Sequence, residues 1–249
     1  MTSTHTPPPT VLYGDFSCPW SHLAYRRLAR LRPTGAAFEL RAVEHDPWRA
    51  RPRSSAQESL ACLTEELGRV TALLLPGETL PLAPPPAVPL TRAAVSGYAE
   101  AFASGVADLA APRLFEAYWS RGTDLSSPPA VRALLADAVM AGTSPSDPLR
   151  RWGHAVDVTG GPMTTTAWRL VRRWREEWTA MEKEVVPVLV LPDGEHVYGV
   201  DAVEHLGRLV WTSGVDPGAE LTWPEPGPRP PLDGHGRVQA LYAATGPVW

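Results

Sequence analysis

The sequence predicts an α/β protein in which a β-α-β unit and a later strand hairpin flank a long helical section. Residues 11–17 and 37–43 have the composition of strands, and residues 19–31 between them have helical spacing. A strand pattern is then absent until residues 186–191, which lead into a turn at residues 192–195. The chain therefore combines a small amount of strand with a large amount of helix.

The first three elements each have their own signature. Residues 37–43 alternate apolar and polar side chains, as a half-buried strand does. The preceding helix carries Leu23, Tyr25, Leu28 and Leu31 at helical spacing. A strand–helix–strand connection is normally right-handed, so the first two strands are expected to be parallel.

The middle of the chain shows helical spacing with no alternating stretch. Helices are expected over residues 57–75, 91–105, 110–120, 130–141, 145–158 and 164–185. The last of them has the clearest spacing, and its tryptophans are interpreted as core residues that also allow an aromatic pocket wall. Residues 76–89 are rich in proline and are predicted to be a loop.

The hairpin is followed by a last helix. Residues 196–198 form the returning strand, and Asp201 and Glu204 have the spacing of a capping box for a helix that ends at Trp211. The predicted organisation is a disordered N-terminus (1–10), a core (11–49 and 186–211), a helical insertion (50–185) and an irregular C-terminal arm (212–249).

Composition limits the function classes. The 249 residues carry a formal net charge of -4, which argues against a general nucleic-acid or anionic-membrane partner. No apolar run is long enough to span a bilayer, and residues 1–10 lack the basic start and apolar stretch of a secretory signal. Two cysteines in unlike contexts do not make a disulfide framework, so a cytoplasmic protein is expected. The sequence leaves a homodimer open.

Cys18 is the residue that most strongly indicates chemistry. It follows a strand and precedes Pro19, which suits the first position of a helix because its missing N–H costs nothing there. Cys18 is therefore the expected N-cap, where free N–H groups and the helix dipole favour the reactive thiolate. Cys62 has a helical context instead and is interpreted as a packing residue. The sequence thus predicts a single activated sulfur at Cys18.

Two neighbours of Cys18 are candidate catalytic residues, each with an alternative. Ser21 stands where a second cysteine would complete Cys-x-x-Cys, and it either donates its hydroxyl to the sulfur or only caps the turn. His22 lies one turn after Cys18 and either raises the thiolate population or moves a proton, or is a solvated surface histidine. Residues 44–46, which read Glu-His-Asp, are not interpreted as a metal site, because three adjacent side chains cannot all face one ion.

Three short motifs point to a known family. Residues 15–24 read DFSCPWSHLA, a valine–proline junction stands at Val186-Pro187, and residues 198–201 read YGVD. Together they resemble the DsbA family, and more narrowly its branch of 2-hydroxychromene-2-carboxylate isomerases and kappa-class glutathione transferases. The resemblance covers about residues 11–211 and implies a thioredoxin fold with a large all-helical insertion.

The chain departs from each branch of that family at one position. The isomerase branch often reads Ser-Pro-Tyr-Ser, with a serine where Cys18 stands, and similar DsbA-like oxidoreductases read Cys-Pro-Trp-Cys, with a cysteine where Ser21 stands. The resemblance implies a cis Val186–Pro187 bond and a site for glutathione or another low-molecular-weight thiol. The implied lining of that site is Trp20, Val186, Pro187, Tyr198 and Asp201.

Three functions are consistent with the sequence. The favoured one is an enzyme that isomerises a conjugated double bond of a small molecule by reversible thiol addition, which needs one sulfur and no resolving cysteine. The second is a DsbA-like monothiol thiol–disulfide oxidoreductase, in which an outside thiol or Cys62 resolves an adduct on Cys18. The third is a non-catalytic binding protein with a degenerate thioredoxin site. No metal, nucleic-acid or membrane partner is expected in any of them.

Overall fold

The computed structural model describes residues 8–45, 56–83 and 88–227, which contain one four-stranded mixed sheet with the strand order β2-β1-β3-β4. The strands are β1 (Thr10–Gly14), β2 (Phe38–Ala42), β3 (Val188–Val190) and β4 (His196–Tyr198). β1 pairs in parallel with β2 and antiparallel with β3, and β3 pairs antiparallel with β4. The expected parallel β-α-β unit and the later hairpin therefore belong to one sheet.

The centre of the sheet is apolar because β1 is covered on both faces. Leu12 of β1 lies in register with Leu40 of β2 and with Leu189 of β3, and all three side chains are buried. A strand that is buried on both faces reads as a continuous apolar run, as residues 11–13 do. Burial thus explains why β1 lacks the alternation that β2 shows.

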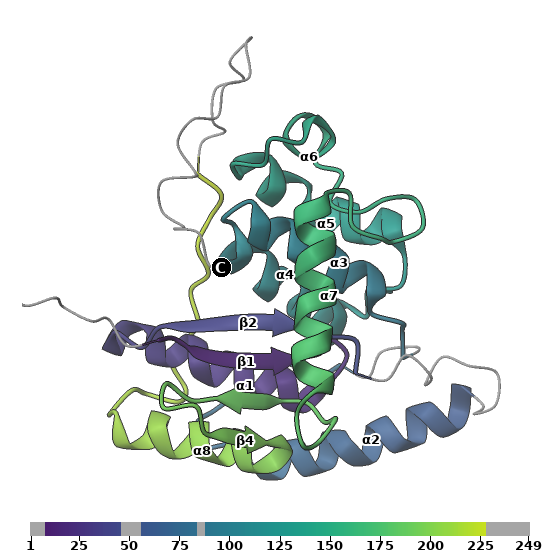
Figure 1. Cartoon of the computed structure of the whole chain (residues 1–249). Helices are drawn as coiled ribbons and strands as arrows, with labels where there is room; N and C mark the ends of the chain where they lie inside the picture. The colour runs from purple at the N-terminus through teal and green to yellow at the C-terminus, as the bar shows by residue number, and fades with distance from the viewer. Residues whose placement is uncertain (1–7, 46–55, 84–87, 228–249) are drawn as a thin grey trace, which may run out of the picture.

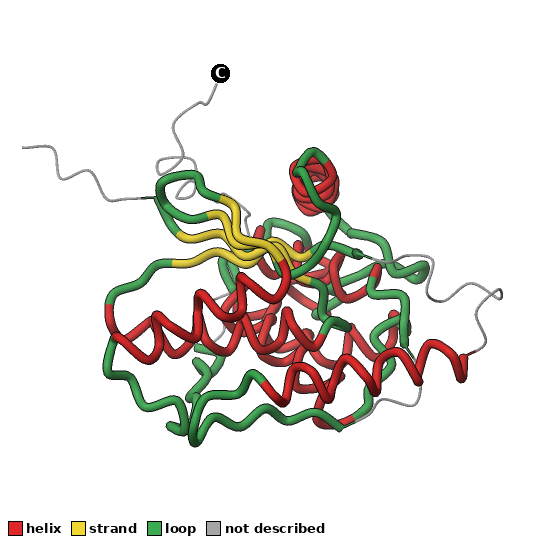
Figure 2. The backbone as a smooth tube through the Cα atoms, turned by 90° about the horizontal axis from the view of Figure 1, so that it is seen from below, coloured by secondary structure: helices red, strands yellow, loops and turns green. Residues whose placement is uncertain are grey.

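Helices cover both faces of this sheet. α7 (Thr165–Thr179) crosses one face, and α1 (Pro19–Leu31) and α8 (Gly199–Thr212) lie together against the other, so that Figure 2 shows the strands as a layer between helices. α7 buries Trp174 and Trp178 in the core, as predicted, whereas Trp168 near its start remains 51% exposed.

The helices between β2 and β3 divide between two places. α3 to α6 pack on one another in the upper part of Figure 1, whereas α2 packs against α1 in its lower part. Their bounds are α2 (Ala56–Ala72), α3 (Arg92–Ala103), α4 (Ala107–Arg121), α5 (Pro128–Ala141) and α6 (Asp147–Trp152), and a 3-10 turn, η1 (Arg32–Thr34), follows α1. The described residues between β2 and β3 contain no strand, as their spacing predicts.

Several expected helices end earlier than their spacing suggests, and the difference is largest for two of them. The segment 145–158 is helical only to Trp152, because Gly153 adopts a left-handed conformation with a φ of 64° and ends the helix. The segment 164–185 is helical only to Thr179, where the chain turns toward β3. Apolar spacing alone does not contain these stop signals.

Only part of each predicted terminal segment lies within the described residues. Residues 1–7 of the N-terminal segment and residues 228–249 of the C-terminal arm lie outside the described residues. Residues 213–227 contain no helix or strand, in keeping with an irregular arm. None of the described helices is long and apolar enough to cross a membrane.

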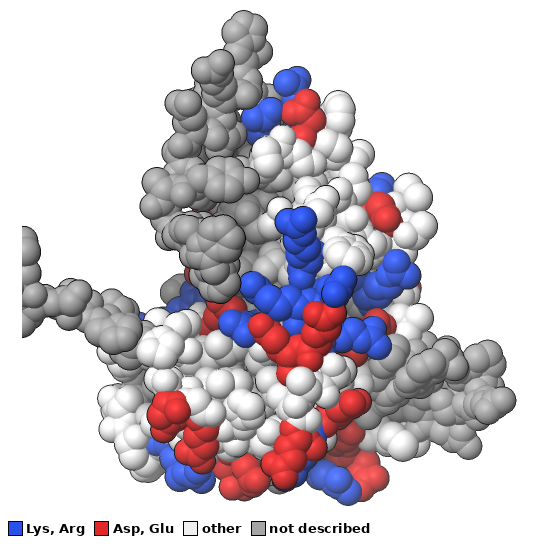
Figure 3. All heavy atoms as spheres, viewed as in Figure 1, with Lys and Arg blue, Asp and Glu red and all other residues white. Residues whose placement is uncertain are grey.

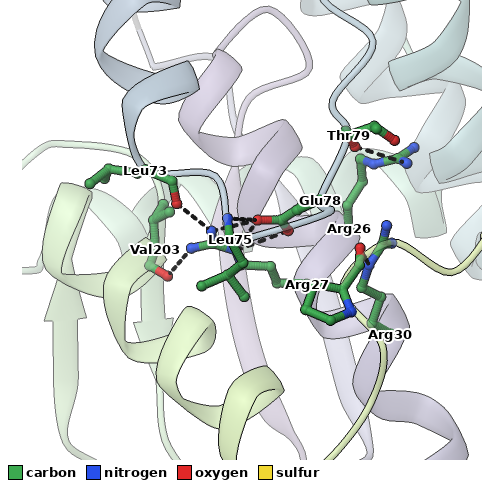
Figure 4. Close-up of polar contacts among 9 residues, drawn as sticks. Arg26, Arg27, Arg30, Leu73, Leu75, Glu78, Thr79 and Val203 are labelled. Atoms are coloured by element: carbon green, nitrogen blue, oxygen red, sulfur yellow. Dashed lines mark hydrogen bonds and ion pairs between the residues drawn. The ribbon is translucent and has the colours of Figure 1, made fainter.

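A buried ion pair fixes α8 and the segment after α2 to α1 (Figure 4). The side chains of Arg27 in α1 and Glu78 after α2 are each only 1% exposed, and their closest N–O distance is 2.7 Å. Arg27 also donates to the carbonyl oxygens of Leu73 and Val203 at 2.7 Å each, and the Leu75 N–H donates to Glu78 at 3.0 Å. Both buried charges are therefore paired and hydrogen-bonded, as stable burial of charge requires.

Candidate active site

Cys18 lies at the junction between β1 and α1, at the position expected for an N-cap. Its backbone is extended, with a φ of -92° and a ψ of 119°, and Pro19 is the first residue of α1. The residue is only 4% exposed, and its Sγ lies 3.8 Å from the carbonyl oxygen of Val186. The Val186–Pro187 peptide bond is cis. The sulfur, the first turn of α1 and the segment before β3 therefore meet at one point.

The Cys18 thiol is not activated in this conformation. Burial raises its pKa to about 12, and the negative charges of Glu66 and Asp15 act in the same direction. Hydrogen bonds from the backbone and side chain of Ser21 lower the pKa, but they do not offset the loss of solvent. The expectation that the N-cap position makes Cys18 a thiolate is therefore wrong for this closed site, because that argument omits burial.

Ser21 stabilises the turn before α1, which is one of the two roles that its position allows. Its side chain is fully buried, and its Oγ accepts a hydrogen bond from the Asp15 N–H at 3.2 Å. The proximity of Ser21 lowers the pKa of the Cys18 thiol, but not enough to offset burial. The serine thus holds the turn before α1 beside the sulfur, although it cannot form a disulfide.

His22 is buried, so its interpretation as a solvated surface histidine is wrong. The residue is 1% exposed, and its ring stacks on Phe115 and Trp119 of α4 with centroid distances of 5.2 Å and 6.0 Å. Burial and the charge of Arg26 hold its pKa well below 6.5, so the ring is neutral at pH 7. Its Nδ1 has no hydrogen-bond partner among the described residues. A neutral ring can take part in proton transfer, but it cannot stabilise a thiolate by charge.

Asp15 belongs to the motif around Cys18, but the sequence pattern did not identify it as a site residue. Its buried carboxylate accepts hydrogen bonds from the Ser17 N–H at 2.8 Å, the His45 N–H at 3.0 Å and the Thr91 hydroxyl at 3.1 Å. Burial alone raises the pKa of Asp15, but the hydrogen bonds from His45 and Ser17 outweigh it and keep the pKa below its usual value. The carboxylate thereby joins the Cys18 turn to the end of β2 and the start of α3.

Within the polar run at residues 44–46, His45 contacts Asp15. The Nδ1 of His45 lies 3.8 Å from the Asp15 carboxylate, and Asp46 lies outside the described residues. In the ranges that the structure describes, no group of three or more His, Cys, Asp or Glu side chains could hold a metal ion.

The residues expected to line a thiol site are only partly brought together. The carbonyl oxygen of Val186 accepts a hydrogen bond from the Cys18 sulfur at 3.8 Å. The Pro187 carbonyl oxygen accepts a hydrogen bond from the Gly199 N–H at 2.7 Å, which ties the segment before β3 to the start of α8. Trp20 is half-buried against the core in the first turn of α1.

Tyr198 and Asp201 have contacts that do not involve Cys18. The Tyr198 hydroxyl lies 3.2 Å from the His196 Nδ1, and the Lys183 Nζ lies 5.3 Å from the Tyr198 ring centroid. α8 begins two residues before Asp201, so Asp201 lies in the first turn and the prediction that it is the N-cap is wrong. Asp201 is exposed, and no hydrogen bond joins either side chain to Cys18 within the described structure.

Cys62 is exposed on α2, so its interpretation as a packing residue is wrong. The buried side of this part of α2 consists of Leu63, Leu67 and Val70. Cys18 and Cys62 are both free thiols. The accessible sulfur is therefore Cys62 and the buried one is Cys18.

The strand order, the cis-proline segment and the cysteine at the start of α1 define a protein of the thioredoxin-fold class. The family model of the DsbA-like thioredoxin domain matches residues 11–145, which is more than half of the chain. The chain therefore belongs to the DsbA-like thioredoxin-domain family, and the predicted fold is confirmed. No curated protein matches the chain.

Two solved structures similar to this chain carry different activities in their descriptions. A 2-hydroxychromene-2-carboxylate isomerase is 21% identical, with 83% of this chain and 98% of that chain covered and a TM-score of 0.52. A protein described as a probable DsbA oxidoreductase from Streptomyces coelicolor is 17% identical, with 86% of this chain and 93% of that chain covered and a TM-score of 0.54. At these identities the likeness shows a shared fold alone.

Proposed function

We propose that this chain is an enzyme that isomerises a conjugated double bond of a small molecule by reversible thiol addition at the Cys18 site. One observation carries the proposal: the start of α1 holds one sulfur, because Ser21 occupies the place of a second cysteine and is buried against Cys18. A dithiol cycle needs two sulfurs that can form a disulfide, and serine does not supply one. Isomerisation needs one thiol and transfers no electrons between molecules.

The burial of Cys18 favours a bound low-molecular-weight thiol as the adding group. A thiol with a pKa of about 12 is almost entirely protonated at pH 7. Its S–H can instead donate a hydrogen bond to the thiolate of a bound small thiol, as a serine hydroxyl at the same position would. This role for Cys18 accommodates both the cysteine of this chain and the serine of the branch that it resembles.

The proposed reaction has three steps. The small-molecule thiolate adds to the β-carbon of a conjugated carbonyl compound, and the π electrons move to the carbonyl oxygen, which becomes an enolate. The former double bond is now single and rotates. The enolate then expels the thiolate and restores the double bond in the other geometry. Substrate and thiol leave with the same oxidation state and the same protons with which they entered.

Isomerisation of a cis aryl enone in the presence of glutathione tests this proposal. Cys18→Ser is expected to keep most of the activity, because its hydroxyl donates the same hydrogen bond. Cys18→Ala is expected to lose about 10- to 100-fold, as for a lost hydrogen bond to a charged group. An equally complete loss in both variants would show that Cys18 itself is the adding group. Thiol oxidation with no change in alkene geometry would reject isomerisation.

A monothiol thiol–disulfide oxidoreductase is the second candidate. The exposed thiol of Cys62 favours it. The charge of Glu66, one turn after Cys62 in α2, raises the pKa of Cys18, so this part of α2 lies near the Cys18 sulfur. A disulfide substrate would form a mixed disulfide with one cysteine and release one thiol, and a second thiol would then resolve the mixed disulfide. Reduction of insulin by the wild type but not by Cys18→Ser would support this candidate over the isomerase.

A further inference from the structure

A cavity of about 300 Å³ lies between the end of β2, the start of α3 and α7. Its charged lining residues are Glu44, Arg92, Arg172 and Arg175, and Cys18 is not among the residues that line it. We propose that this cavity is a second binding site, which takes an organic anion: a carboxylate or sulfonate group on a flat apolar body. The proposal is independent of the thiol chemistry at Cys18.

Two of the three arginines have no bonding partner among the residues that the structure describes. Arg92 is the first residue of α3 and Arg175 lies in α7, and neither forms a hydrogen bond or ion pair with another residue in the described ranges. Arg172, in contrast, pairs with Glu176 at an N–O distance of 2.6 Å. Because Arg92 and Arg175 come from different elements and line the same cavity, an anion there can bind both guanidinium groups.

The acidic groups nearby leave both arginines available. Glu44 is half-buried, and burial and the charge of Asp15 raise its pKa, whereas Arg175 and Arg92 lower it. The charge of Arg92 also lowers the pKa of Asp157, whose Oδ1 accepts N–H hydrogen bonds from its own loop at 2.7 and 2.8 Å, but the described structure contains no ion pair between Asp157 and Arg92. Glu44 therefore acts as a competing anion within the cavity, and removal of its charge is expected to tighten binding.

The apolar side of the cavity determines what kind of anion fits. Trp168 and Val171 of α7 line it, and Trp168 remains 51% exposed despite its size. The Arg172 guanidinium carbon lies 5.6 Å from the Trp168 ring centroid and covers part of the indole. An exposed indole beside guanidinium groups favours a flat ring that carries a negative charge over a bare inorganic ion.

The surface charge around the cavity suits the same ligand. Figure 3 shows Lys and Arg side chains gathered across the middle of the face that α7 crosses, with Asp and Glu side chains directly below them. The cationic side chains of α7 include Arg169, Arg172, Arg173 and Arg175. A positive surface of this kind raises the local concentration of anions and speeds their association.

Calorimetric titration of the full chain with 2-naphthoate tests the proposal. The titration uses the Cys18→Ala variant, so that the result does not depend on the Cys18 site or on the proposed isomerase activity. Arg92→Ala and Arg175→Ala are each expected to weaken the Kd for 2-naphthoate by about 10-fold or more, and Glu44→Gln to tighten it several-fold. The matched control is Arg169→Ala, which removes a charge from α7 outside the cavity lining and is expected to leave the Kd within about 2-fold.

Two further probes test whether binding requires both the negative charge and the flat ring of the ligand. The neutral analogue 2-naphthalenemethanol and the small anion acetate are each expected to bind at least about 10-fold more weakly than 2-naphthoate, because each lacks one of the two interactions. Equal binding of the alcohol, unchanged binding in both arginine variants, or no binding of 2-naphthoate at millimolar concentration would each overturn the proposal. Thermal melts of the variants show whether they fold, and both arginines are exposed, so folding is expected to be retained.

Discussion

The Arg27–Glu78 pair and the Cys18–His22 turn both bury polar groups on α1, but they do so in opposite ways. The Arg27 guanidinium bonds to Glu78 and to two carbonyl oxygens, so both charges are paired. The Cys18 thiol has a raised pKa, and the His22 Nδ1 has no partner among the described residues. On one helix, the Arg27–Glu78 pair is therefore satisfied, whereas the His22 imidazole near the helix start is not.

This difference indicates which cluster is structural and which is a site for chemistry. A fully hydrogen-bonded ion pair holds three elements together and needs no ligand. A buried imidazole nitrogen without a partner costs free energy, and an apolar ring of similar shape would avoid that cost. Groups retained in such surroundings are more common at functional sites than elsewhere. The comparison supports placing the chemistry at the Cys18 end of α1.

The largest expected effect is at the satisfied cluster. Arg27→Met leaves the Glu78 carboxylate buried without its partner, so the free energy of unfolding is expected to fall by about 3–5 kcal/mol. Urea denaturation measures the change. The double variant Arg27→Met/Glu78→Met, which removes both charges, is expected to recover most of the loss. Arg26→Met is the neighbouring control, because Arg26 is less buried and makes one 3.4 Å hydrogen bond to the Thr79 carbonyl oxygen. A loss below about 1 kcal/mol in Arg27→Met would contradict this account.

The next effect concerns the two thiols. Iodoacetamide is expected to alkylate Cys62 at least about 100-fold faster than Cys18 at pH 7, because Cys62 is exposed and Cys18 is a buried thiol with a raised pKa. Peptide mass spectrometry over time gives both rates. Denaturation in urea is expected to remove most of the difference. Equal rates in the native protein would show that the Cys18 site is open in solution.

A smaller effect is expected at His22. His22→Phe keeps a ring between Phe115 and Trp119 and removes the unpartnered nitrogen, so it is expected to stabilise the fold by about 1 kcal/mol at pH 7. If His22 takes part in proton transfer, the same variant loses activity despite its higher stability. A variant that is less stable than the wild type would show that the nitrogen has a partner, such as an ordered water.

The same residue predicts a pH dependence. The pKa of His22 is lower in the folded state than its unfolded value of 6.5, so below that pH the unfolded state binds a proton that the folded state does not. Stability is therefore full above pH 6.5 and falls as the pH decreases toward the folded-state pKa. Between pH 7 and pH 5.5 the wild type is expected to lose about 1 kcal/mol relative to His22→Phe, measured by urea denaturation at both pH values.

The smallest effect tests the electrostatics of Cys18. Glu66→Gln removes a negative charge that raises the pKa of the thiol, so Cys18 alkylation is expected to become about 2- to 5-fold faster. Glu65→Gln is the matched control in the same turn of α2, because Glu65 pairs with Arg69 on the exposed side of the helix. An equal change in both variants would mean that a general loosening of α2, and not the charge of Glu66, controls the rate.

The sequence by itself determined the local features of this protein. The spacing of apolar residues predicted the β-α-β unit and the helices before β3, and the Cys18–Pro19 step predicted the start of α1. These signals are local because periodicity, capping and turn chemistry depend on residues a few positions apart. The same locality explains the errors, since Gly153 and the start of α8 changed helix ends that spacing alone did not define.

The tertiary structure alone decided the character of the site. Phe115 and Trp119, nearly a hundred positions after His22 in the sequence, bury its ring and make it neutral. The burial that raises the pKa of Cys18, and the meeting of Arg92 with Arg175 at one cavity, likewise come from elements that the sequence separates. Solvent exclusion and charge proximity depend on distance in space, so a pattern along the chain predicts which residues carry chemistry but not the state in which the fold holds them.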